Sequence, residues 1–114
     1  MIFSKLFGKK EMNQEAAEKF WQFFAAEQET FISILTGDDS RAKQVLIGAV
    51  DQLLCPVFPY EKPEAIEFQL GSNNGVHEFS LYHGGRMPLA KDMRALLEMM
   101  PEAVRTVWTI ELTN

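Results

Sequence analysis

Residues 66–83 read IEFQLGSNNGVHEFSLYH, and this stretch decides the fold. Ile66, Phe68 and Leu70 alternate with polar residues, which is the period of a half-buried β-strand. A turn rich in Gly, Ser and Asn follows, and the residues up to His83 alternate again. The stretch therefore predicts a β-hairpin whose connecting loop has about five residues.

Two helical segments precede the hairpin. Residues 14–36 carry large apolar side chains at helical spacing, with Asn13 as the expected N-cap and Gly37 as the expected left-handed C-cap. A second run of the same kind follows an N-cap among residues 38–40 and ends at Pro56. Because so few residues separate the two segments, we expect them to fold back as a helical hairpin.

A third helix and a third strand follow the hairpin. Two glycines break the strand pattern after His83, Pro88 suits the first turn of a helix, and Pro101 ends that helix. The last strand is expected over residues 104–112, with alternate side chains facing the core. Upstream of the hairpin, the three prolines of residues 55–63 predict an extended crossing from the second helix.

The predicted element order is α-α-β-β-α-β, an α+β domain over residues 13–114 that follows a basic and apolar segment over residues 1–12. A strand–helix–strand connection leaves the last strand parallel in direction to the second. We expect it to pair with the first strand, giving a three-stranded antiparallel sheet of order 2-1-3 with helices on one face. Its open edges favour a homodimer. The other face is expected to meet water and to carry Glu67, Gln69, Glu78, Ser80, Tyr82, Arg105, Val107, Thr109 and Glu111.

The composition describes one small acidic globular chain. Its 114 residues are 46% hydrophobic and 24% charged, which suits a folded domain. Residues 1–10 hold three lysines and no acid, so the remainder, with 8 basic and 16 acidic side chains, carries a net charge of −8. An acidic body has no electrostatic drive toward nucleic acid and is steered toward a basic partner. The single cysteine precludes an internal disulfide and fits a reducing compartment, so the expected location is cytoplasmic.

Residues 1–10 read MIFSKLFGKK and combine apolar side chains with lysines. Ser4 and Lys5 interrupt the apolar run, so it does not resemble a secretory signal, and no later stretch approaches the ~18 apolar residues of a membrane span. Two interpretations stay open. The segment is either an amphipathic foot on an anionic membrane, or a terminus that frays or tucks its Phe side chains onto the body.

Neither a metal site nor a nucleophilic site is indicated by the residue pattern. His77 and His83 would stand roughly 20 Å apart along one strand, too far to share a metal. Cys55 follows a helix end, where the helix dipole disfavours a thiolate. The sequence contains no phosphate loop, dinucleotide fingerprint or nucleophile elbow. We therefore expect no catalytic residue, no metal and no cofactor, and we lean toward a protein that is not an enzyme.

The first candidate site is the corner formed by His83, Gly84, Gly85 and Arg86. Free backbone N–H groups at a helix start and a guanidinium suit a phosphate or a carboxylate. With His83 as acid or base, the corner would serve a small ligand-binding protein or enzyme. The simpler interpretation is that the two glycines only turn the chain between strand and helix.

The second candidate is an interaction surface on the first helix, where residues 20–24 read FWQFF. Phe20 and Phe24 belong to the core stripe, whereas Trp21 and Phe23 point further round the helix. These two rings are either covered by another part of the chain or exposed as a contact site, because interface cores are rich in Trp and Phe. Three carboxylates of the same helix would steer a basic partner toward it: Glu18, Glu27 and Glu29.

Several of these features together resemble a known kind of protein. They are the Phe-Trp-x-x-Phe motif at 20–24, the hairpin ending in a glycine, and the Leu-Leu-Glu-Met-Met-Pro run at 96–101 followed by Trp-Thr-Ile at 108–110. This combination is similar to small bacterial cytosolic proteins of unknown function, from Phe20 onward. Such proteins often carry a second Trp in the opening motif, where this chain has Phe. The resemblance implies an α+β fold and brings no activity and no site residue.

Three functional hypotheses follow. The first is a non-enzymatic protein that acts through protein–protein interaction, for example an immunity-type inhibitor of a basic toxin or another neutralising protein. The second is an anion- or ligand-binding protein, or a small enzyme, that uses the corner at residues 83–86. The third is a membrane-edge adaptor that uses residues 1–10. We favour the first because of the acidic charge of the body.

Overall fold

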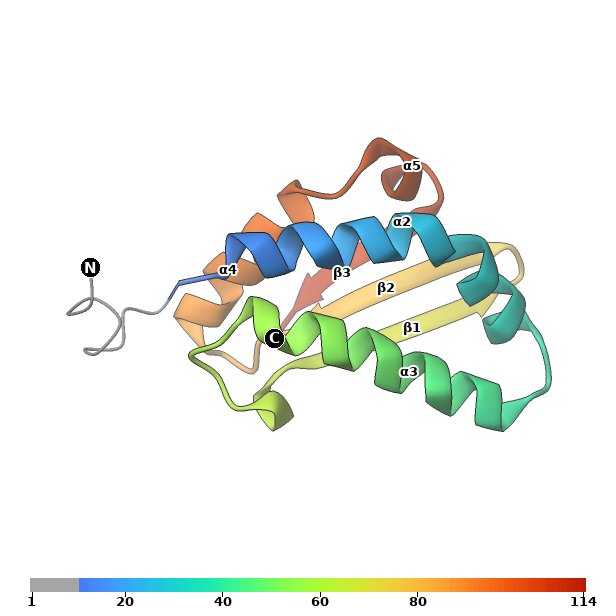
Figure 1. Cartoon of the computed structure of the whole chain (residues 1–114), viewed down its shortest axis with the longest axis horizontal. Helices are drawn as coiled ribbons and strands as arrows, with labels where there is room; N and C mark the ends of the chain where they lie inside the picture. Colours follow the sequence, from blue (N-terminus) through green and yellow to red (C-terminus); the bar gives the residue numbers. More distant parts are fainter. Residues whose placement is uncertain (1–10) are drawn as a thin grey trace.

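The structure is a computed structural model that describes residues 11–114, and Figure 1 shows its helices laid across a three-stranded sheet. The predicted α+β class is confirmed over this part of the chain. Both interpretations of residues 1–10, the membrane foot and the terminus that frays or tucks onto the body, concern a segment outside the described residues.

Helix α2 (Gln14–Thr36) has the predicted bounds. The side chain of Asn13 accepts a hydrogen bond from the N–H of Ala16, as expected of an N-cap. The expected left-handed cap at Gly37 is wrong, because this residue is extended, with φ −87° and ψ −175°. Its N–H donates to the carbonyl of Ile34, so one tight turn ends the helix and leads directly into the next cap.

Helix α3 (Ser40–Leu54) begins at Asp39, whose carboxylate accepts the N–H of Ala42. The predicted extended crossing after α3 is wrong. Two 3₁₀ turns, Cys55–Val57 and Pro63–Ala65, replace much of it. Each contains a proline in its first turn, where the fixed φ angle suits a helical backbone and the missing N–H costs no hydrogen bond.

Strands β1 (Glu67–Asn73) and β2 (Val76–Tyr82) form the predicted antiparallel hairpin. The connecting loop has two residues rather than the expected five, because β1 continues to Asn73. Asn74 and Gly75 both have positive φ angles, 52° and 81°, which defines a two-residue turn. An Asn-Gly pair is the usual sequence of such a turn, since both residues tolerate this backbone region.

Helix α4 (Met87–Glu98) is followed by the short helix α5 (Glu102–Arg105) and by strand β3 (Trp108–Thr113). The predicted start of this strand at residue 104 is therefore wrong. The carbonyl of Pro101 accepts the N–H of Val104, so a helical turn forms here, and Val104 reaches the core from that turn.

The sheet has the order β1-β2-β3, and the predicted antiparallel order 2-1-3 is wrong. Strand β3 pairs parallel with β2, with Ile110 opposite Phe79. Helix α4 returns the chain beside the strand that it left, as a strand–helix–strand crossover commonly does. The central position of β2 explains why Ser80, which faces away from the helices, is buried with Phe79 and Leu81.

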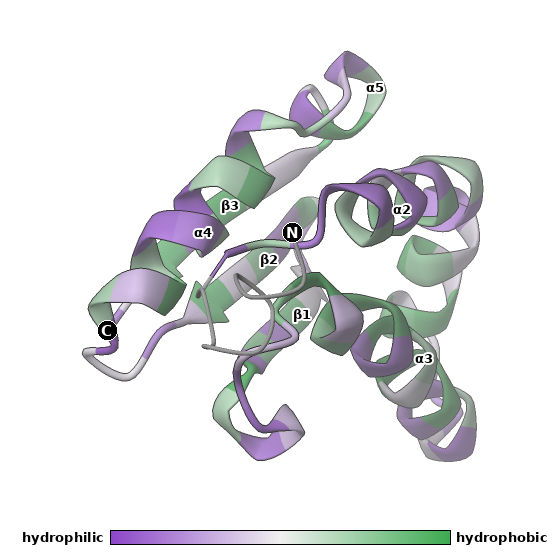
Figure 2. Ribbon diagram, turned by 60° about the vertical axis from the view of Figure 1, so that its left-hand side comes forward, coloured by the Kyte–Doolittle hydropathy of each residue, from purple (hydrophilic) through white to green (hydrophobic). Residues whose placement is uncertain are grey.

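The core lies between the helices and the sheet, with Phe79 at its centre. The Phe79 ring centroid lies 5.5 Å from that of Phe24, 6.0 Å from that of Phe20 and 6.3 Å from that of Trp21. The indole N–H of Trp21 donates to the carbonyl of Leu96 over 2.8 Å and so ties α2 to α4. Figure 2 shows α2 and α3 side by side on one flank and α4 along β3.

Phe79→Ala is expected to lower the free energy of unfolding by about 3–5 kcal/mol, because the deletion leaves a cavity at the centre of the core. Phe23→Ala removes the same atoms from a half-buried position on α2 and is expected to cost less than half as much. Urea unfolding followed by tryptophan fluorescence measures both losses. Equal losses would contradict the central role of Phe79.

Candidate functional site

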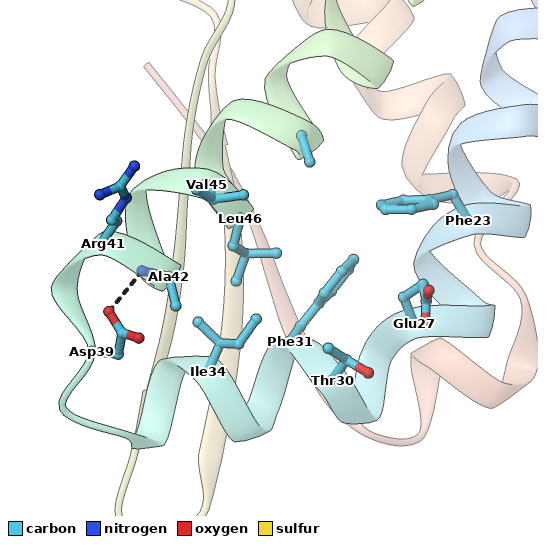
Figure 3. Close-up of a pocket in the computed structure, with 11 residues that line it drawn as sticks. Phe23, Glu27, Thr30, Phe31, Ile34, Asp39, Arg41, Ala42, Val45 and Leu46 are labelled. Carbon is cyan, nitrogen blue, oxygen red and sulfur yellow. Dashed lines mark hydrogen bonds between the residues drawn. The ribbon is translucent and has the colours of Figure 1, made fainter.

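An apolar groove of about 390 Å³ lies between α2 and α3. Figure 3 shows its side chains facing one another across the gap between the two helices, with strands behind them. We call it the hairpin groove, and its apolar lining consists of Phe23, Phe31, Ile34, Ala42, Val45, Leu46 and Ala49.

The groove exists because α3 has apolar residues on more than its buried face. Leu46 and Val50 lie on that face and pack into the core. Val45 and Ala49 each precede one of these residues by one position, which rotates them by about 100° around the helix. The sequence pattern places Val45 in the core stripe, yet its side chain is 66% exposed, and Figure 3 shows it pointing into the gap.

Phe31 joins the core to the groove. Its ring is almost fully buried and lies edge-on to Phe24, with ring centroids 5.1 Å apart. On its other side its centroid lies 5.7 Å from that of Phe23, which is half-buried and forms part of the α2 wall. The exposed wall is therefore held in place by the core behind it.

Trp21 and Phe23, the two rings for which the sequence allows either burial or exposure, have different environments. Trp21 is only 3% exposed and its indole N–H is bonded inside the fold, so it belongs to the core. Phe23 is the ring that stays partly exposed.

The three expected steering carboxylates do not form one cluster. Glu27 lines the hairpin groove, together with Asp39 and Arg41. Glu18 lies at a separate cavity of about 330 Å³ near Pro101, and Glu29 is exposed on α2 and lines neither cavity. Of the three, Glu27 alone lines the hairpin groove.

At the predicted anion corner, two backbone donors are used within the turn, those of Gly85 and Arg86. Gly84 and Gly85 have φ angles of 60° and 77°, a region that favours glycine. The N–H of Gly85 donates to Nδ1 of His83 over 3.1 Å, and the N–H of Arg86 donates to the carbonyl of His83. These contacts match the simpler interpretation, in which the glycines turn the chain.

The guanidinium of Arg86 is paired with a carboxylate through one of its nitrogens. It bonds the carboxylate of Glu61 over 3.1 Å, and that carboxylate side chain is 11% exposed. An open cavity of about 630 Å³ lies beside them and is also lined by Glu64, Glu67 and Lys62. Because carboxylates outnumber cations here, the local potential does not favour a bound anion.

Two titratable side chains near this region are perturbed toward their neutral forms. Burial, and then the charge and hydrogen bond of Asp51, raise the pKa of the Cys55 thiol to about 11. Burial and Asp92, which accepts the phenol hydrogen over 2.6 Å, raise the pKa of Tyr60 far above its ordinary value. Neither group is prepared to act as a nucleophile or base at neutral pH.

The remaining candidates are accounted for by local contacts. Nδ1 of His77 shares a 2.7 Å hydrogen bond with the hydroxyl of Ser72. Within residues 11–114, no three His, Cys, Asp or Glu side chains come close enough to hold a metal ion. None of the helices in this same range has the length and apolar character needed to cross a membrane.

Asp51→Asn is expected to lower the pKa of Cys55 and so speed its alkylation by iodoacetamide at pH 8. The gain should stay below about tenfold, because burial, the larger cause of the raised pKa, is unchanged. Asp92→Asn, which touches Tyr60 instead, is the control and should leave the rate unchanged. A wild-type rate that stops rising below pH 9 would contradict the raised pKa.

Inorganic phosphate is expected to bind the corner no more tightly than about 10 mM, since Glu61 already occupies the guanidinium of Arg86. Arg86→Ala should therefore change little, whereas Glu61→Gln should strengthen phosphate binding by freeing the cation. The amide chemical shifts of Gly84 and Gly85 in an NMR titration with phosphate measure the affinity of each variant. A sub-millimolar affinity in the wild-type chain that Arg86→Ala abolishes would instead support an anion site.

Comparison of the chain with protein-family models, with curated proteins and with solved structures found no match. Its function has to be inferred from its own surfaces.

Proposed function

We propose that this chain is a non-enzymatic protein that acts by binding another protein on the surface formed by α2 and α3. The observation that carries this proposal is the hairpin groove. It leaves Val45 mostly in water and Phe23 partly so, beside the buried side chains of Phe31 and Leu46. A lined apolar depression of this kind, rather than a scattered exposed side chain, marks a surface that gains stability when a partner covers it.

The partner is proposed to be basic. Outside its first ten residues the chain carries a net charge of −8, and Glu27 and Asp39 stand at the groove itself. Such a field accelerates the approach of a positively charged protein and orients it toward the groove. An immunity-type inhibitor of a basic toxin is the narrower form of this proposal. Its support is the negative charge of the chain and nothing further.

The proposal includes a cytoplasmic location, because Cys55 is a free thiol of the kind that reducing compartments maintain. Self-association through an open sheet edge is compatible with it, since β1 and β3 each pair on one side only within the described residues. The alternative function, a ligand site at the corner of Gly84, Gly85 and Arg86, has less support because Glu61 neutralises the cation.

Charge reversal tests the proposal. We expect the wild-type chain to retain a basic protein from a lysate of the cells that encode it, and Glu18→Lys/Glu27→Lys/Glu29→Lys to weaken binding to the purified partner at least tenfold. The control reverses three carboxylates on the open sheet face, one from each strand: Glu67, Glu78 and Glu111. It makes the same change in net charge and should have a much smaller effect.

Salt supplies a second criterion. Affinity for the partner should fall as ionic strength rises, because exposed charges are screened beyond about 8–10 Å. If the affinity for the partner changes neither with ionic strength nor in either triple variant, the electrostatic part of the proposal is contradicted. Equal losses in the two triple variants would show that overall charge, and not the α2 surface, sets the affinity.

A further inference from the structure

We propose that the hairpin groove receives one amphipathic α-helix of the partner, with its apolar side chains between α2 and α3 and basic side chains beside Glu27 and Asp39. This inference rests on the proposed function. It adds the secondary structure of the bound segment, the place where it binds and its charge pattern.

The length of the groove fits a short helical segment. Along α2 its lining extends from Phe23 to Ile34, a rise of about 16 Å or three turns. Apolar residues spaced i, i+4 and i+7 on a bound helix cover about 10 Å of that length. A volume of about 390 Å³ accommodates a few such side chains rather than a larger protein surface.

The walls of the groove favour a helix over an extended strand. An extended peptide that binds by strand addition needs unpaired backbone N–H and C=O groups on its receptor. Here both walls are the sides of helices, α2 and α3, whose interior backbone groups are bonded within each helix. A bound segment must therefore satisfy its own backbone, which a helix does.

Small residues allow close approach. Ala42 and Ala49 stand on the α3 wall beside Val45, and Figure 3 shows the wide gap between this wall and Phe23. A neighbouring helix packs at about 8–10 Å where the residues at the contact are small. Large side chains of the partner can then reach the floor formed by Phe31 and Leu46.

The charges at the groove set the polarity of its occupant. Glu27 stands on the α2 wall and Asp39 at the start of α3, so each helix brings one carboxylate. Among residues 11–114, Arg41 is the one cation that lines the groove, and Figure 3 shows its guanidinium pointing away from the apolar side chains. Lysines or arginines flanking the apolar face of the bound helix would complement both carboxylates.

The experiment uses the full chain and a synthetic peptide. The peptide is a fluorescein-labelled helix of about 14 residues, with Leu at positions i, i+4, i+7 and i+11 and with Lys and Ala elsewhere. Fluorescence anisotropy measures its affinity at low and at physiological salt. We expect saturable binding that weakens with salt, and at least tenfold weaker binding by Val45→Glu.

Ile47 provides the matched control. It is an exposed branched apolar residue of α3, two positions from Val45, and it does not line the groove. Ile47→Glu adds the same charge and should change the affinity less than twofold. Val45→Ser, which adds no charge and is made at a mostly exposed position, should still weaken binding and separates loss of contact from repulsion. Circular dichroism verifies that each variant is folded.

Several results would overturn the inference. These are no binding up to about 1 mM peptide, equal losses in Val45→Glu and Ile47→Glu, or equal affinity for a peptide with Glu in place of Lys. Residues 1–10 of this chain also combine five large apolar side chains with three lysines. Tighter binding of a peptide with that ten-residue sequence would assign the groove to the chain itself. Binding to phosphatidylserine vesicles that Val45→Glu abolishes would assign it to a membrane.

The two proposals fail in different ways. Suppose that charge reversal of α2 abolishes binding of the natural partner, but Val45→Glu binds it as tightly as the wild-type chain. The proposed function then stands, and the partner does not bind in the groove. If the helical peptide binds as expected but no partner depends on the α2 carboxylates, the groove stands and the proposed basic partner does not.

Discussion

The packing of α2 against Phe79 is the contact on which the rest of the structure depends. Phe79 lies on the central strand, hydrogen-bonded to a neighbour on each side, and its ring meets Phe20 and Phe24 of the long helix. This contact fixes α2 across the sheet. Helix α3 follows after a short turn, so its position is set by α2, and the hairpin groove is what their side chains leave uncovered between them. The candidate site is thus a by-product of how the core is built.

Much of the fold can be predicted from the sequence, because caps and periodicity are local signals. Asn13 fixes the start of α2, and alternation identifies both strands of the hairpin. Strand order cannot be predicted in the same way, since alternation says which face a side chain takes and not which strand lies beside it. The orders 2-1-3 and β1-β2-β3 turn the same alternate residues toward the helices. Two local signals do point to the observed arrangement: the Asn74-Gly75 pair indicates a two-residue turn, and small Ser80 suits a central strand.

The candidate site is less predictable, for physical reasons that differ between its parts. A helical wheel groups Val45 with Leu46, and only the placement of α3 against α2 decides that one is exposed and the other buried. At the glycine corner, Gly84 and Gly85 form the expected turn. Arg86, however, is neutralised by Glu61, which lies 25 residues upstream in another loop. No pattern within the motif carries that contact. The half-exposed ring of Phe23 shows the opposite case, because its angular position on α2 already sets it apart from the core stripe.

The attachments of α2 also bear on how the chain reaches its native state. The indole of Trp21 is bonded to a carbonyl 75 residues later in the sequence, and that of Trp108 is bonded to Gln28, 80 residues earlier. Closing loops of this length slows folding relative to a bundle held by local contacts. During synthesis the helical pair emerges well before the sheet that covers its aromatic side, so those rings stay uncovered while the later segments are made. Apolar surface that is uncovered during this interval is prone to aggregate.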